Sequence, residues 1–151
     1  MKAKEGAMGK INWTRVLLGG LVAGAVGNVL MFAGWGIFTR PTLSAALDAL
    51  GQPLQETFIS TVIGVVLGFL VMILVMWLYA AIRPRYGAGP RTALVAGVAA
   101  GFLFAVFPDM GWGLTLRLIP GRVWATDAVV SLVVIVIATL LGAWVYKEEG
   151  P

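Results

Sequence analysis

The longest pattern in the sequence is an apolar run without charge, Thr57 to Ile82, which covers 26 residues. About 20 apolar residues, rising 1.5 Å each, cross the roughly 30 Å hydrocarbon layer of a bilayer, so this run is long enough to span it with some tilt. Three other runs repeat the pattern. The sequence therefore predicts an all-α polytopic membrane protein with four transmembrane helices, over residues 13–38, 55–82, 92–116 and 124–146.

The first span matches a bilayer closely. Val16 to Thr39 carries no charge, and Trp13 and Trp35 lie 22 residues apart, or about 33 Å along a helix. Tryptophan favours the two water interfaces of a membrane, so both residues are expected there. Arg40-Pro41 predicts the end of this helix.

A short helix is predicted next, over residues 42–51. Thr42 is a plausible N-cap and Gly51 a C-terminal stop. Its apolar residues share one face, which predicts an amphipathic helix on the outer surface; they are Leu43, Ala46, Leu47 and Leu50.

Prolines mark the limits and the bend of the third span. Pro84 and Pro90 prevent the second and third helices from merging. Pro108 predicts a kink, beyond which the helix continues to Trp112 or further.

Composition fits this reading and removes several kinds of chemistry. The chain is 60% hydrophobic and 12% charged, with a mean hydropathy of +0.93, too much apolar surface for one small soluble core. It has no Cys and no His, the usual ligands of zinc, haem and iron–sulfur clusters. No paired carboxylates, activated nucleophile or phosphate loop occurs at a useful spacing. We therefore predict no catalytic, metal or cofactor-ligating residue, and no enzyme activity.

The positive charges predict topology rather than nucleic-acid binding. With the N-terminus inside, the inner loops hold eight Lys and Arg and the outer loops three, which favours both termini in the cytoplasm. Residues 1–12 are then a basic cytoplasmic segment; we expect the first span to be retained rather than cleaved as a signal peptide. The outer three are Arg40, Arg117 and Arg122.

A weak internal repeat accompanies the four spans. A shift of 77 residues places eight identities within 21 positions, from Gly20 on Gly97 to Arg40 on Arg117. A shift of 67 places Trp77 and Tyr79 on Trp144 and Tyr146. We interpret the chain as two parallel helix hairpins, the first with the surface helix inserted, related by an axis normal to the membrane.

Small residues recur at four-residue spacing in every span. In lipid, helices associate largely through close backbone approach at such residues. The predicted packing glycines are Gly20, Gly24, Gly64, Gly68, Gly97, Gly101 and Gly142. Self-association is the alternative use of these stripes. The bulky stretch Phe69 to Met76 of the second span is expected to face lipid or a partner protein.

Two polar residues stand out inside the spans. Asn28 lies about 10 Å below Trp35, where an amide usually hydrogen-bonds to a neighbouring helix. Asp109 is the one carboxylate within the hydrophobic part of the third span, and pairing with an outer arginine is expected. A proton or cation site is the alternative, and it needs a second polar group at similar depth; the candidates are Thr115, Thr126 and Asp127.

The loop Arg83-Pro-Arg-Tyr-Gly-Ala-Gly-Pro-Arg91 is basic and tight. Its residues suit anionic lipid headgroups or an acidic partner; they are Arg83, Arg85 and Arg91 with Trp77 and Tyr86. Together with Asn12-Trp-Thr-Arg-Val-Leu-Leu-Gly-Gly, the segment from Trp77 through this loop resembles a group of small bacterial inner-membrane proteins. The resemblance implies four helices and a bacterial cytoplasmic membrane, and it transfers no activity and no site.

Two functions follow as hypotheses. The first is a non-catalytic accessory or scaffolding subunit that packs on a larger membrane complex, such as an energy-transducing one, through the second span and the basic loop. The second is a small homo-oligomeric transporter or channel that uses Asn28 and Asp109.

Overall fold

The computed structural model describes residues 11–115 and 117–146, and the basic segment 1–10 and Lys147 lie outside them. Every regular element of the described chain is helical. As predicted, its continuous helices include four that are long and apolar enough to cross a membrane: Trp13–Asp48, Phe58–Tyr86, Pro90–Thr115 and Gly121–Val145.

The first helix does not end at Arg40-Pro41. It runs from α1 (Trp13–Gly34) through a π turn, η1 (Trp35–Thr39), into α2 (Arg40–Asp48). The predicted separate surface helix is thus the last part of a longer one, and Thr42 is not an N-cap, since its hydroxyl donates to the Thr39 carbonyl at 2.8 Å. Gly51, with φ of +70°, follows the end of the helix as expected.

The third helix passes its proline in the same way. It consists of α4 (Pro90–Gly101), a π turn, η2 (Phe102–Val106), and α5 (Phe107–Thr115). Both π turns end two residues before a proline, Pro41 or Pro108. A proline ring collides with the carbonyl four residues back in an α-helix. In a π turn the residue before the proline bonds five back, from Arg40 N to the Trp35 carbonyl and from Phe107 N to the Phe102 carbonyl.

The other two spans are uninterrupted. α3 (Phe58–Tyr86) begins with a capping box, in which the Thr57 side chain accepts from Ser60 N and the Ser60 hydroxyl accepts from Thr57 N, each at 3.1 Å. It continues through Pro84, four residues beyond the predicted end at residue 82. α6 spans Gly121–Val145.

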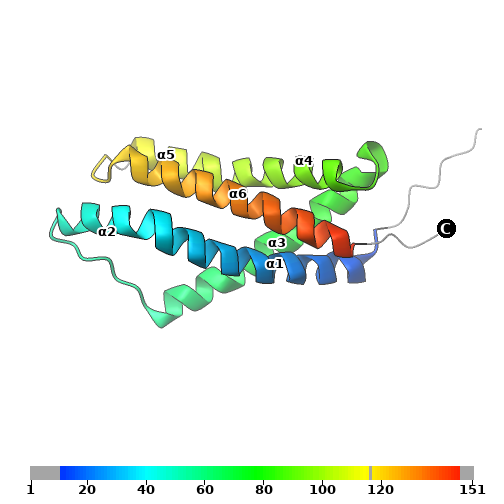
Figure 1. The fold of residues 1–151 in the computed structure, drawn as a ribbon, viewed down its shortest axis with the longest axis horizontal. Helices are drawn as coiled ribbons and strands as arrows, with labels where there is room; N and C mark the ends of the chain where they lie inside the picture. Colours follow the sequence, from blue (N-terminus) through cyan, green and yellow to red (C-terminus); the bar gives the residue numbers. More distant parts are fainter. Residues whose placement is uncertain (1–10, 116, 147–151) are drawn as a thin grey trace, which may run out of the picture.

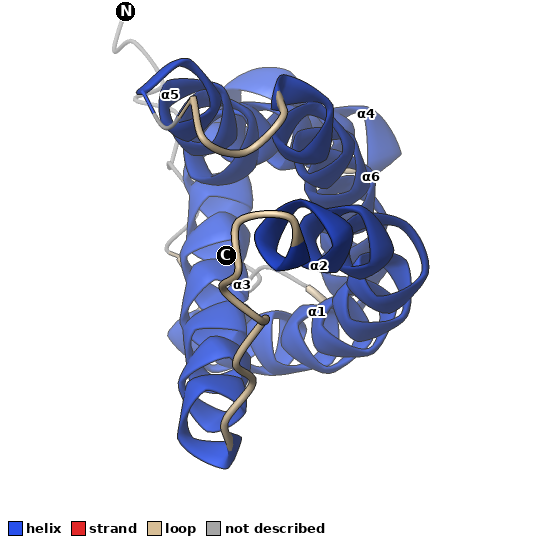
Figure 2. Cartoon of the chain, turned by 90° about the vertical axis from the view of Figure 1, so that its left-hand side faces the viewer, coloured by secondary structure: helices blue, strands red, loops and turns tan. Residues whose placement is uncertain are grey.

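Three of the four long helices form a layer, and the fourth, α3, crosses it. α1 packs on α6, and α6 packs on α4 and α5, while α3 lies across one face of that layer (Figures 1 and 2). We name the two ends of the bundle by the chain: the proximal end holds Trp13, Tyr86, Pro90 and Val145, and the distal end holds Asp48, Phe58, Thr115 and Gly121.

Glycine determines how closely the helices approach. A Cβ built on Gly20 would lie 2.7 Å from the Ile73 Cα atom of α3, and one on Gly142 would lie 2.7 Å from the Gly19 carbonyl oxygen of α1. Met76 enters the notch between these helices, with its Cε atom 3.1 Å from the Cβ position of Gly19, and is fully buried. A bulky side chain of α3 therefore fills the space that glycines leave open.

This packing reverses one expectation. The stretch Phe69 to Met76 does not face lipid as a whole: Met72, Val75 and Met76 are buried in the core. The distal half of α3 is the exposed one, with Phe58 84% exposed. Gly64 lies there and has nothing within 4 Å of its Cβ position, so it does not pack as predicted. The small residues of α3 and those of the other helices lie at different depths. Bulky side chains of α3 therefore pack against the glycines of α1, and Gly64 of α3 has no small residue opposite it.

Substitution of Gly20 by Ala tests this packing. The new methyl group would meet the α3 backbone, so α1 and α3 must separate. We expect the free energy of unfolding to fall by about 1–3 kcal/mol, measured as a lower melting temperature in mild detergent. Gly64→Ala is the matched control, because its methyl group enters open space and Ala favours a helix. Equal melting temperatures for the two variants would contradict the glycine-notch packing.

Candidate functional site

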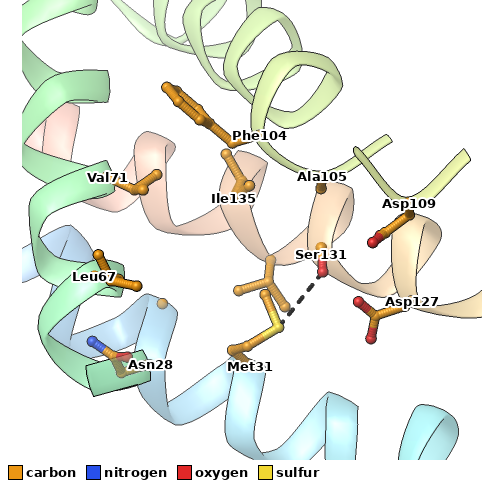
Figure 3. Close-up of a pocket in the computed structure, with 14 residues that line it drawn as sticks. Asn28, Met31, Leu67, Val71, Phe104, Ala105, Asp109, Asp127, Ser131 and Ile135 are labelled. Atoms are coloured by element: carbon orange, nitrogen blue, oxygen red, sulfur yellow. Dashed lines mark hydrogen bonds between the residues drawn. The ribbon is translucent and has the colours of Figure 1, made fainter. Parts of the chain in front are cut away.

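A partly open cavity of about 270 Å³ lies between α1, α3, α6 and the η2–α5 segment (Figure 3). We call it the polar cavity. Its lining residues are Gly27, Asn28, Met31, Gly64, Leu67, Gly68, Val71, Phe104, Ala105, Asp109, Asp127, Ser131, Val134 and Ile135. It therefore joins the two polar residues singled out in the sequence, Asn28 and Asp109, with two further polar side chains.

Two carboxylates face each other at one side of this cavity. Asp109 comes from α5, immediately after the π turn and Pro108, and Asp127 from the first turns of α6 (Figure 3). Ser131 follows Asp127 by four residues and so lies on the same face of α6. Its hydroxyl contacts the Met31 sulfur of α1 at 3.7 Å. Asp127 was one of three candidates for the second polar group, and Thr115 and Thr126 do not line the cavity.

One oxygen of each carboxylate is buried and makes no hydrogen bond of good geometry within the described chain. These atoms are Oδ2 of Asp109 and Oδ1 of Asp127. Thr39, only 2% exposed, lies beside Asp127, yet its hydroxyl makes no hydrogen bond of good geometry among the same residues. A partly buried carboxylate needs a proton, a cation or donors to offset its lost hydration. The two carboxylates therefore give this side of the cavity a negative potential.

The expected ion pair of Asp109 does not form among the described residues. Arg40 instead binds Glu56 through two bonds, Nε to Oε1 at 3.1 Å and Nη2 to Oε2 at 3.2 Å. That pair ties the α2 segment to the loop before α3. Neither Arg117 nor Arg122 makes an ion pair with a described carboxylate. A salt bridge thus does not explain why Asp109 lies in an apolar helix.

Asn28 behaves as a packing residue at the opposite side of the cavity. Its Nδ2 atom donates to the Gly24 carbonyl at 2.9 Å and, across to α3, to the Val65 carbonyl at 3.3 Å. A Cβ on Gly68 would lie 2.6 Å from the Asn28 Oδ1 atom, so Gly68 makes room for the amide. The expected bond to a neighbouring helix is present.

The remaining predicted packing glycines lie against a neighbouring helix. Gly24 faces the ring of Phe69 on α3, and Gly97 and Gly101 face Val136 and Leu132 on α6. None of these three glycines lines the polar cavity.

The basic loop residues separate into two kinds. Arg85, Tyr86 and Arg91 are exposed at the proximal end, as a headgroup contact requires; Trp77 is 42% exposed. Arg83 instead turns inward, with its guanidinium carbon 5.3 Å from the centroid of the Tyr146 ring. The same ring meets Tyr79 edge to face, with centroids 5.7 Å apart. Arg83 is therefore part of the packing that joins α3 to the end of α6.

The polar cavity is suited to binding a positive charge. Its ionisable side chains are two carboxylates, and no described group of three or more His, Cys, Asp or Glu residues could hold a metal ion. The Ser131 hydroxyl is directed to the Met31 sulfur rather than to a carboxylate.

Comparison of the chain with protein-family models, with curated proteins and with solved structures found no match.

Asparagine at either carboxylate position distinguishes a binding seat from a structural group. Asp109→Asn and Asp127→Asn keep the shape and remove the uncompensated charge, so the melting temperature should stay equal or rise. Asn28→Leu removes the hydrogen bond from α1 to the Val65 carbonyl of α3 and should lower the free energy of unfolding by about 0.6–1.7 kcal/mol. A large fall in melting temperature for both Asp variants would indicate that the carboxylates hold the fold.

Proposed function

We propose that this chain is a membrane transporter that binds a positively charged solute in the polar cavity and moves it across the bilayer. The observation that carries the proposal is the pair Asp109 and Asp127, which face each other between apolar helices and form no ion pair with a described cation. Ionisable groups within membrane spans are costly, and they are found mostly along substrate or ion pathways.

The proposed setting is a bacterial cytoplasmic membrane with both termini inside. Arg83, Arg85 and Arg91 then lie at the cytoplasmic face, the last two on anionic lipid, in accord with the bias of positive residues. The proximal end is inside in this orientation, and the polar cavity lies in the outer half of the bilayer.

Two similar hairpins support the proposed repeat. Gly20 and Gly24 of α1 receive Ile73 and Phe69 of α3, four residues apart. Gly97 and Gly101 of α4 receive Val136 and Leu132 of α6 with the same spacing. The equivalent residues Tyr79 and Tyr146 contact each other. Repeats with a binding site between them are a common plan of transporters.

The asymmetry between the hairpins supports a moving part. Throughout the described chain α1 packs extensively on α6, whereas the corresponding pair, α3 and α4, touches less, and α3 does not pack appreciably on α5. The distal half of α3 therefore forms a loosely held wall of the cavity. Segments with few buried contacts open at low cost, as a transport cycle requires.

The accessory-subunit hypothesis is the second proposal, and the structure changes its basis. One face of the proximal half of α3 is taken up by the core, so a partner protein would use the exposed distal half, from Phe58 to Leu67, or the outer stripe of Leu70, Leu74 and Trp77. Transport is better supported, because docking on a partner gives no role to the facing carboxylates.

Flux through reconstituted vesicles tests the proposal. Proteoliposomes with a potential-sensitive dye, given gradients of Na⁺, K⁺ or small organic ammonium ions, should show charge movement that falls at least tenfold in Asp109→Asn and Asp127→Asn. Asp48→Asn, on the exposed end of α2, is the matched control and should keep full flux. Wild-type vesicles no leakier than empty ones to every cation would reject transport.

Cysteine labelling tests the orientation, since the chain has no cysteine of its own. Ala49→Cys, at the distal end, should react with an impermeant maleimide in intact bacterial cells. Ala88→Cys, in the loop before α4, should react only after the membrane is opened; both positions are exposed. The reverse pattern would invert the proposed topology.

A further inference from the structure

We propose that the solute of the polar cavity is an organic cation with an apolar body, such as an aryl or alkyl ammonium ion, rather than a metal ion. This inference rests on the proposed transport function and names its substrate class.

The lining of the polar cavity is divided into two regions. Asp109, Asp127 and Ser131 gather at one side, while Leu67 and Val71 of α3 lie at the other (Figure 3). The Asn28 amide lies on that second side, where its Nδ2 atom is hydrogen-bonded to the Gly24 and Val65 carbonyls. Most of the wall is apolar. A ligand that fills the cavity must therefore present charge at one end and hydrocarbon at the other.

The polar cavity offers few oxygen ligands to a metal ion. Calcium requires six to eight oxygen ligands and magnesium about six, some of them from water. The described lining offers two carboxylates, one hydroxyl and, at the opposite side, the Asn28 amide, and it contains no group of three or more His, Cys, Asp or Glu residues that could hold a metal ion. An ammonium group with carbon substituents needs few ligands, since it is weakly hydrated and its charge is balanced by carboxylate alone.

The cavity holds two negative charges that no described cation balances. Asp109 and Asp127 both line it, and neither forms an ion pair with a described Arg or Lys. Thr39, which is 2% exposed, interacts with the Asp127 carboxylate from outside the cavity. Two carboxylates in one cavity favour a positively charged ligand.

One wall of the polar cavity borders the lipid-facing surface of the bundle. The cavity is bounded by the distal half of α3, where Leu67 is 53% and Ile63 53% exposed to the surroundings of the bundle. An amphiphilic cation concentrates at the membrane interface, and the sparse contact between α3 and α5 in the described chain favours its entry on that side.

The test uses a pair of ligands that differ in charge alone. Phenyltrimethylammonium and its neutral carbon analogue, tert-butylbenzene, are titrated by calorimetry into the full chain in lipid nanodiscs. We expect saturable binding of the cation, weakened at least tenfold by Asp109→Asn and by Asp127→Asn and unchanged by Asp48→Asn, with no comparable binding of the neutral analogue. Melting temperatures of the Asn variants confirm that they are folded.

A second variant probes the apolar wall. Leu67→Ala shortens a half-exposed side chain of the cavity and should weaken binding of the organic cation about threefold to tenfold, without affecting the fold. Equal binding by wild type and both Asn variants would overturn the inference. So would displacement of the organic cation by millimolar Na⁺ or Ca²⁺ that itself supports Asp109-dependent flux; in that case transport stands and the substrate class is wrong. Absence of both binding and flux for every cation would remove the two proposals together.

Discussion

Close contact between helix backbones is the constraint on which this structure depends. Lipid tails are as apolar as leucine, so the hydrophobic effect gives the helices little reason to associate, and packing has to come from shape. Glycines of α1, α4 and α6 allow that approach, since a single methyl group at Gly20 or Gly142 would meet backbone atoms of the next helix. The core is correspondingly made of small residues, into which α3 inserts Met72, Val75 and Met76.

The position of the polar cavity follows from how this contact is distributed. Notches on α1 receive the proximal half of α3, and the tyrosine pair with Arg83 secures the same end. Across the distal half of α3 the described helices separate, and only the Asn28 amide, seated against Gly68, bridges to α1 there. A bundle held firmly at one end and open at the other can combine a stable fold with a wall that moves.

The sequence predicted the parts of this structure that depend on composition and local period. Uncharged runs bounded by Trp, Arg and Pro were enough for the four apolar helices, because span length is set by bilayer thickness. It could not predict which half of α3 is buried, since a bulky face and a lipid-facing one look alike in hydropathy. The pairing of Asp109 with Asp127 was equally hidden: they lie 18 positions apart on two helices, and their approach depends on how α5 and α6 are rotated. Arg40 illustrates the same limit, because its partner Glu56 lies in a loop without a regular pattern.

The π turn before Pro108 has a consequence for the carboxylate that follows it. In an α-helix each residue advances about 100°, so residues at four-residue spacing drift steadily around the axis. A turn bonded to the fifth residue winds more slowly and cancels part of that drift. Asp109 therefore stays in phase with Gly101 and Ala105, which face α6, instead of rotating toward lipid. If Phe102–Val106 returned to ordinary α-helical pairing, α5 would rotate about its own axis. The Asp109 carboxylate would then turn out of the polar cavity without any change in sequence.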